Sequence, residues 1–192
     1  LEGEMWDNLM KYDDWFTLAV AYAMTGNYID FGAVDNVNEE DLNKYLSVAK
    51  DIPVNEEEYL SLKTDIKKAK NLVYLTDNCG EVVMDKLLIE EIGRQNPELH
   101  ITVIVRGEEV LNDATMVDAE QIGLTSIVKV IGNGSGVAGT SMRDISKEAL
   151  ELMEQADVLI AKGQGNYETL CNQGFHIFYS FLCKCDLFMR RF

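Results

Sequence analysis

Acidic and amide side chains interrupt the stretch VYLTDNCGEVVMDKLL, residues 73–88. The stretch begins as an apolar run and ends with apolar residues at helical spacing. Asp77 and Asn78 lie between these two parts, and a further acid, Asp113, follows a later apolar run. Carboxylate and amide oxygens are the ligands that hard divalent cations prefer. These residue types therefore predict a metal site.

Oxygen ligation by Asp77, Asn78 and Asp113 favours Mg²⁺ or Mn²⁺ over a structural Zn²⁺. Two carboxylates in one place repel each other, and a cation between them removes that repulsion. A structural interpretation also stands: Asp77 or Asn78 caps the helix that follows, and Asp113 caps a helix that begins near Ala114. The residue types alone leave both interpretations open.

Cationic and glycine-rich segments follow other apolar runs. Arg106 and Lys162 each come directly after a run, and we expect both to face an anionic substrate group. The segment GNGSGVAGT, residues 132–140, offers backbone N–H groups to the oxygens of such a group, although its glycines can also serve only to turn the chain. Because four polar segments each follow an apolar run, we prefer a shared site to four separate turns.

Short apolar runs that alternate with helical patterns must position these residues. The runs span 72–76, 101–105, 127–131 and 157–161, and the helical patterns span 82–94, 114–122 and 145–155. Strands that alternate with helices predict a parallel sheet covered by helices. Ligands of such sheets bind beyond the carboxyl ends of the strands, which is where the polar segments lie.

The first third of the chain predicts helices only. Apolar residues from Trp15 to Tyr22 lie on one face of a helix that we expect to stop at Gly26 and Asn27. A second helix is expected over 42–49. A third follows Pro53, with Asn55 and Glu58 placed as a capping box.

Composition excludes several classes of protein. A net charge of −16 over 192 residues argues against nucleic-acid binding. No apolar run approaches the roughly 20 residues of a membrane helix, so we expect a soluble, cytoplasmic protein. The four cysteines, Cys79, Cys171, Cys183 and Cys185, form no paired zinc motif and are expected to be buried free thiols. His100 and His176 are expected to be structural or surface residues.

Three blocks of sequence resemble, in this order, the signature blocks of the metal-dependent damage-control phosphatases: LTDNCGEVVMDKLLIEEI, VRGEEVLNDATMVDA and DVLIAKGQGNYETL. GNYIDFGA, residues 26–33, is similar to a further block in the helical part of prokaryotic members. The resemblance implies a three-layer α/β/α fold with a mainly parallel Rossmann-like sheet and an N-terminal all-helical subdomain. We expect a helical subdomain over 1–68, incomplete at its start. The catalytic core would span 69–192 and be truncated at its C-terminus, so that CDLFMRRF is the start of a final strand that is cut short.

The resemblance also implies roles for single residues. Asp77, Asn78 and Asp113 match the metal ligands, and Lys162 matches the basic residue near the phosphate. Asp77, Asp113 and Lys162 are therefore the expected catalytic residues. The expected substrate-binding residues are Glu81, Arg106, Asn112, Gly163, Asn166, Asn27 and Asp30. The chain departs from the family at Cys79, where Ala is usual, and at Arg106, where Lys is usual.

The function that the resemblance implies is hydrolysis of phosphate monoesters of small metabolites, such as sugar phosphates or damaged phosphometabolites. The cofactor would be a divalent ion: Mn²⁺, Mg²⁺, Co²⁺ or Ni²⁺. The attacking group is either a metal-activated water or a carboxylate such as Asp77. The alternatives are a carboxyl methyltransferase that uses S-adenosylmethionine and a non-catalytic metal or metabolite sensor. A small phosphorylated metabolite is the expected partner, with no nucleic acid or membrane, and no oligomeric state is predicted.

Overall fold

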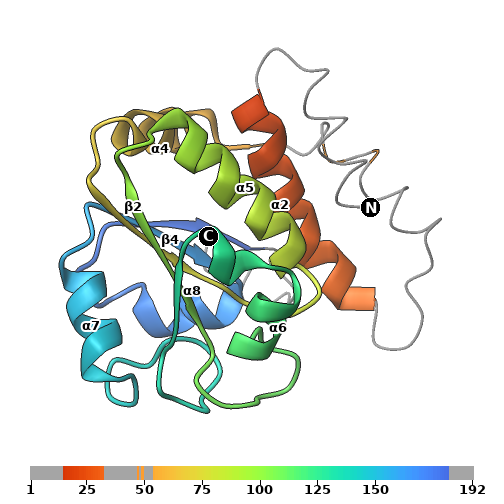
Figure 1. Cartoon of the computed structure of the whole chain (residues 1–192), viewed down its shortest axis with the longest axis vertical. Helices are drawn as coiled ribbons and strands as arrows, with labels where there is room; N and C mark the ends of the chain where they lie inside the picture. The colour runs from red at the N-terminus through yellow and green to blue at the C-terminus, as the bar shows by residue number, and fades with distance from the viewer. Residues whose placement is uncertain (1–14, 33–46, 48, 50–53, 182–192) are drawn as a thin grey trace.

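A five-stranded parallel sheet forms the centre of the molecule (Figure 1). The computed structural model describes residues 15–32, 47, 49 and 54–181. Its strands are β1 (Asn71–Leu75), β2 (His100–Val105), β3 (Lys129–Gly132), β4 (Val158–Lys162) and β5 (Ile177–Ser180). Every neighbouring pair is parallel, in the order β3-β2-β1-β4-β5. The predicted parallel sheet is confirmed, and its order matches the first five strands of the doubly wound arrangement.

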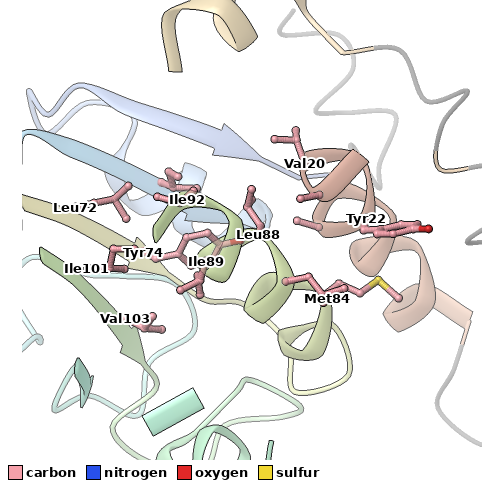
Figure 2. Close-up of a cluster of buried hydrophobic side chains, with 14 of the residues drawn as sticks. Val20, Tyr22, Leu72, Tyr74, Met84, Leu88, Ile89, Ile92, Ile101 and Val103 are labelled. Atoms are coloured by element: carbon pink, nitrogen blue, oxygen red, sulfur yellow. The ribbon is translucent and has the colours of Figure 1, made fainter. Parts of the chain in front are cut away.

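Helices cover both faces of the sheet. One face packs against α2 (Trp15–Gly32), α4 (Glu56–Ile66), α5 (Val82–Gln95), α6 (Met116–Gln121) and a 3-10 turn at Leu124–Ser126; the other packs against α7 (Lys147–Glu154) and α8 (Gln164–Leu170). Side chains of a strand alternate between faces, so Leu72 and Tyr74 join the α2 and α5 core, whereas Val73 and Leu75 join the core beneath α7 and α8. Figure 2 shows the first of these cores. The three-layer α/β/α prediction is confirmed.

Helix α2 does not stop at Gly26 and Asn27 but runs to Gly32, so that prediction is wrong. Gly26 lies where α2 crosses the start of α5, and a Cβ added there would lie 2.7 Å from the Cβ of Glu81. The glycine therefore permits close contact between two helices instead of ending one. Figure 1 shows α2 packed along α5.

The other expectations for local structure have mixed outcomes. Asn55 caps α4, because its side-chain oxygen accepts hydrogen bonds from the backbone N–H groups of Glu57 and Glu58 at 3.1 and 3.2 Å, but the Glu58 side chain does not return a bond to Asn55, so only half of the predicted capping box forms. Strand β5 and helix α8 were not predicted. The helix expected over 42–49 and the strand expected in CDLFMRRF lie almost entirely outside the described residues. Across the part of the chain that the structure describes, no helix has the length and apolar character to cross a membrane.

The cysteines and histidines lie at the surface where they are described. Cys79 and Cys171 are exposed free thiols, so the expectation of burial is wrong for both. Each lies just outside a regular element, Cys79 in the turn before α5 and Cys171 at the end of α8. Cys183 and Cys185 lie outside the described residues. The backbone of His100 starts β2, and the side chain of His176 is 69% exposed.

Candidate functional site

The strand order creates a switch point between β1 and β4. The chain adds β2 and β3 on one side of β1 and then returns to place β4 on the other side. Asp77 follows β1 and Gly163 follows β4, so both lie at this switch point, where ligands of doubly wound sheets bind. Gly163 has a φ of 79°, and a Cβ added there would lie 2.0 Å from Oδ2 of Asp77. The Asp77 carboxylate therefore lies directly against the backbone of Gly163.

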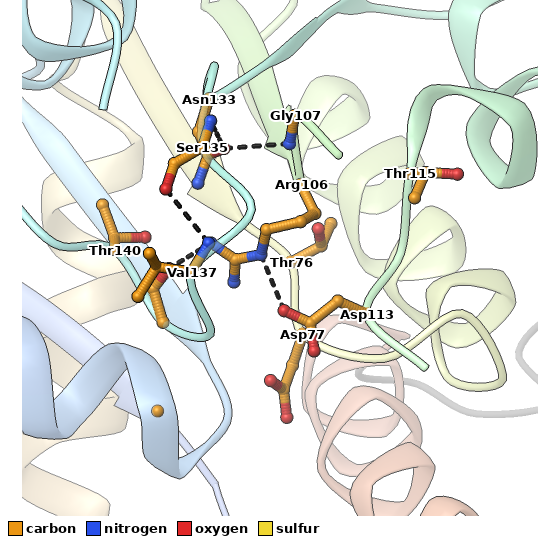
Figure 3. Close-up of polar contacts among 12 residues, drawn as sticks. Thr76, Asp77, Arg106, Gly107, Asp113, Thr115, Asn133, Ser135, Val137 and Thr140 are labelled. Atoms are coloured by element: carbon orange, nitrogen blue, oxygen red, sulfur yellow. Dashed lines mark hydrogen bonds and ion pairs between the residues drawn. The ribbon is translucent and has the colours of Figure 1, made fainter. Parts of the chain in front are cut away.

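The segments that carry Asp77, Asn78 and Asp113 are joined by backbone contacts. Asn78 and Asp113 form an isolated antiparallel bridge. The N–H of Ala114 donates to the carbonyl of Asp77 at 2.7 Å, and the N–H of Cys79 donates to the carbonyl of Asn112 at 2.8 Å. Figure 3 shows the carboxylates of Asp77 and Asp113 at this junction. The structure thus brings the three predicted metal ligands together.

Other residues begin the neighbouring helices, so the capping interpretation is wrong for all three. The residue that precedes α5 is Glu81. The residue that precedes α6 is Thr115, whose N–H and hydroxyl donate to Asp118 at 2.8 and 2.7 Å. Asp77, Asn78 and Asp113 therefore lie outside the helix caps. Their side chains carry carboxylate and amide oxygens, the atom types that suit a hard divalent cation, and the amide nitrogen of Asn78 donates to Oδ2 of Asp77 at 3.0 Å.

Arg106 connects Asp113 to the glycine-rich loop. Its side chain is 3% exposed, and its Nε donates to Oδ2 of Asp113 at 2.7 Å (Figure 3). Its Nη1 donates to the carbonyl of Gly139. The side-chain oxygen of Asn133 secures the same loop by accepting from Gly107 and Ser135, both at 2.9 Å. The guanidinium that was expected to face substrate is therefore engaged by protein acceptors.

The glycine-rich loop uses several of its own N–H groups. Those of Ser135, Val137 and Thr140 donate to side-chain oxygens of the protein. These three donors are therefore not part of the expected cradle for substrate oxygens in this structure. Residues 132–140 instead form a loop whose backbone is held by hydrogen bonds to protein side chains.

Asn166 joins three parts of the site. It is 1% exposed, and its amide nitrogen donates to the carbonyls of Thr76 and Lys162 at 3.0 and 2.7 Å. Its amide oxygen accepts from the hydroxyl of Thr140 at 2.7 Å. The ends of β1 and β4 and the glycine-rich loop are therefore fixed together by one side chain. Asn112 contributes its backbone carbonyl, which accepts from Cys79.

Lys162 lies beneath the site, and its side chain is 0% exposed. Its ammonium donates to the carbonyl of Ala23 at 2.7 Å, to Oε2 of Glu81 at 2.8 Å and to Oδ1 of Asp85 at 2.7 Å. Burial alone would lower the pKa of Lys162, but Asp85 and Glu81 raise it above its ordinary value, so the ammonium persists. These contacts use the three donors of the group. Its expected contact with substrate stays a prediction.

Sequence reasoning missed Asp85 and Tyr74, which belong to the same network. The hydroxyl of Tyr74 donates to Oδ1 of Asp85 at 2.8 Å, and both residues are fully buried. A signal for Asp85 was present, because this acid falls among the apolar positions Met84, Leu87 and Leu88 of a helix. Asn27 and Asp30 lie in α2, but their side chains lie outside what the structure describes.

Other candidate sites in the described part of the chain are less suitable. A hollow of about 1050 Å³ lies near the amino ends of β2 and β3 and includes Arg94, His100 and Lys129. Ligands of parallel sheets bind at the opposite, carboxyl ends. Among the described residues, no three His, Cys, Asp or Glu side chains form a metal-binding group. The predicted ligand set contains only two such residues, because its third member is the amide of Asn78.

Comparison with known proteins identifies the family of the chain. The family model described as the damage-control phosphatase ARMT1-like domain matches residues 3–192. The chain belongs to this family. The damage-control phosphatase PH1575 of Pyrococcus horikoshii is 39% identical over 181 residues, which are 91% of this chain and 60% of that protein. A damage-control phosphatase of Archaeoglobus fulgidus is 34% identical over 179 residues, which are 91% of this chain and 60% of that protein.

A crystal structure supports the same relationship. The DUF89 family protein PH1575 superposes with a TM-score of 0.83 at 34% identity, over 92% of this chain and 61% of that one. The chain therefore spans about three fifths of the length of these damage-control phosphatase relatives. The suspected membership is confirmed.

Proposed function

We propose that the protein is a metal-dependent phosphatase that hydrolyses phosphate monoesters of small metabolites, such as sugar phosphates or damaged phosphometabolites. Two of its relatives are named damage-control phosphatases. The observation that carries the proposal is the meeting of Asp77, Asn78 and Asp113 at the sheet's switch point.

The residues present fit a divalent metal ion. Asp77, Asn78 and Asp113 provide carboxylate and amide oxygens, and Gly163 provides the space that the Asp77 carboxylate needs. Such a set suits Mg²⁺ or Mn²⁺, and Co²⁺ or Ni²⁺ are further candidates. When bound, a divalent ion polarises a phosphoryl oxygen and increases the acidity of a bound water.

The chain's own residues would orient the reacting groups. Arg106 holds the carboxylate of Asp113 and balances one of the two negative charges of the ligand set. Asn166 fixes the two strand ends on either side of the switch point. Phosphoryl transfer depends chiefly on such positioning and on electrostatic stabilisation. We therefore assign Arg106 and Asn166 to the support of the site.

An assay on an aryl phosphate tests the proposal. The purified protein is treated with a chelator and then supplied with Mn²⁺, Mg²⁺, Co²⁺ or Ni²⁺. We expect chelation to stop phosphate release, an added ion to restore it, and Asp113→Ala to abolish the restored activity. The matched control is Glu109→Ala, which removes an exposed acid from the same loop and should retain activity. Turnover that survives chelation and Asp113→Ala would overturn the proposal.

A further inference from the structure

A buried chain of polar side chains links the sheet core to the candidate metal site. It begins at Tyr74 in β1, whose hydroxyl donates to Asp85 in α5 at 2.8 Å. Asp85 accepts from Lys162 at 2.7 Å, and Lys162 also donates to Glu81 at 2.8 Å. The side chains of Lys162, Glu81 and Asp85 are 0% exposed. This set of four residues is called the buried relay below.

The relay ends at a predicted metal ligand. Oε1 of Glu81 accepts a hydrogen bond from the backbone N–H of Asn78 at 3.1 Å, while Oε2 accepts from Lys162. A carboxylate held at both oxygens has a fixed orientation, so Glu81 can determine where the turn that carries Asn78 lies. Lys162 also precedes Gly163, against which Asp77 lies. The relay therefore supports both sides of the switch point.

Asp85 is an unfavourable choice for stability alone. Its Oδ1 has two donors, but its buried Oδ2 has no hydrogen-bond partner. An unpaired polar atom in the interior costs free energy, and apolar residues can often replace buried charged groups without loss of stability. Burial, opposed by Lys162 and reinforced by Glu81, raises the pKa of Asp85 to about 6. A buried carboxylate that carries such a cost is a candidate for a role in positioning.

We propose that Asp85, with the help of Tyr74, is a positioning residue for the metal site. Asp85 holds the ammonium of Lys162 in place, Lys162 orients the Glu81 carboxylate, and Glu81 sets the backbone of Asn78. This inference rests on the proposed function, because it assumes that Asn78 binds a metal ion. Asp85 and Tyr74 act through Lys162 and Glu81 and do not touch substrate.

Metal affinity measures this role without reference to turnover. Asp85→Asn and Tyr74→Phe are titrated with Mn²⁺, and the free ion is measured by electron paramagnetic resonance. We expect Asp85→Asn to raise the Kd for Mn²⁺ by about tenfold or more, the size of effect that supporting residues of metal sites have. Tyr74→Phe should raise it by a smaller factor, because Lys162 still holds Asp85 in that variant.

The control is Lys86→Met, one residue further along α5. Lys86 is also buried, and its ammonium donates to the carbonyl of Ile122 at 2.9 Å, away from Asn78. We expect this variant to lower the Tm and to leave the Kd for Mn²⁺ unchanged. A comparison with it separates loss of a buried polar contact from loss of positioning.

The possible outcomes distinguish this inference from the proposed function. If the wild-type protein does not bind Mn²⁺, or if Asp113→Ala binds it equally well, the proposed function fails. If Mn²⁺ binding depends on Asp113 but Asp85→Asn and Tyr74→Phe keep the wild-type Kd, the inference about Asp85 is overturned. Should Asp85→Asn fail to fold, Tyr74→Phe decides alone, and an unchanged Kd in that variant overturns the inference.

Discussion

The absence of a side chain at Gly163 lets the segments after β1 and β4 approach each other closely at the switch point. Gly163 has no Cβ, and the Asp77 carboxylate occupies the space that a Cβ would need. The positive φ of Gly163 adds a second reason for glycine at this position. Side-chain volume and backbone conformation therefore both restrict residue 163, and substitutions can separate the two effects.

Gly163→Ala should impair both stability and metal binding. The new methyl group must displace Asp77, so we expect the Mn²⁺ affinity to fall by about 10- to 100-fold. The control is Gly174→Ala, because Gly174 also has a positive φ, 82°, but no atom lies within 4 Å of an added Cβ. That variant should lose about 1–2 kcal/mol of unfolding free energy and keep its affinity. Calorimetric titration and urea unfolding measure the two quantities, and equal affinities would contradict the explanation.

Arg106→Lys should weaken the connection between Asp113 and the glycine-rich loop. Lysine keeps the charge but has no planar fork, so one ammonium cannot reproduce the contacts to Asp113 and Gly139. We expect a loss of roughly 2 kcal/mol in unfolding free energy, the value typical of a hydrogen bond to a charged group. Urea denaturation measures it. The exposed Arg143 gives the control, since Arg143→Lys should change stability by less than about 0.5 kcal/mol.

At the level of secondary-structure elements, helices α2 and α5 are in close contact. Gly26 of α2 lies against Glu81 at the start of α5, and the carbonyl of Ala23 accepts from Lys162. Helix α2 therefore helps to hold Lys162 and Glu81 beneath the site, although α2 is far from the site residues in sequence. The close approach of α2 leaves no room for a side chain between residue 26 and Glu81.

Gly26→Ala tests the close contact between these helices. Alanine favours a helix by up to about 1 kcal/mol over glycine, but its Cβ would lie 2.7 Å from the Cβ of Glu81. We expect the clash to prevail and to destabilise the protein by about 1–2 kcal/mol. Gly93→Ala in α5 is the matched control, because its Cβ would approach no atom closer than 3.9 Å. Urea unfolding should show that variant to be more stable than the wild type, and a stabilised Gly26→Ala would contradict the argument.

The sequence predicts the elements better than it predicts the direction of their side chains. Runs rich in β-branched residues mark four strands, because strands buried on both faces must be apolar throughout. The run at β5 has only four residues, and α8 has few apolar positions, so both lack a clear pattern. The prediction that the first helix ends at Gly26 is wrong, because the sequence alone does not distinguish a glycine that allows two helices to pack closely from a glycine that ends a helix.

The direction of Lys162 follows from alternation along β4. Ile160 belongs to the core beneath α2 and α5, whereas Ala161 belongs to the opposite core. Lys162 must then point toward α5, where Asp85 and Glu81 receive it. The expectation that it faces a substrate anion considered only its place at the strand end. The meeting of Asp77, Asn78 and Asp113, by contrast, depends on the ends of neighbouring strands, which the topology sets.

Stability of the whole molecule should depend on pH through Asp85. Its pKa is raised to about 6 by burial, so the folded state binds the proton more tightly than the unfolded state does. The contribution of Asp85 to the free energy of unfolding is therefore fully present below about pH 4 and is lost as the pH rises through 6. We expect the stability of the metal-free wild type, relative to Asp85→Asn, to fall over this range. Urea unfolding at several pH values measures it, and a constant difference would contradict the assignment.

The parallel sheet would also couple cation binding at the proposed site to folding. The segments of the proposed site are far apart in sequence: the turn after β1 meets the turn after β2 only when the helix and strand between them have folded, and β4 must pair with β1 before Gly163 reaches Asp77. An unfolded chain thus offers no preformed coordination sphere. By thermodynamic linkage, a metal concentration 100 times the Kd would favour the native state by about 2.7 kcal/mol. The supply of the ion would then add to the stability of the folded protein.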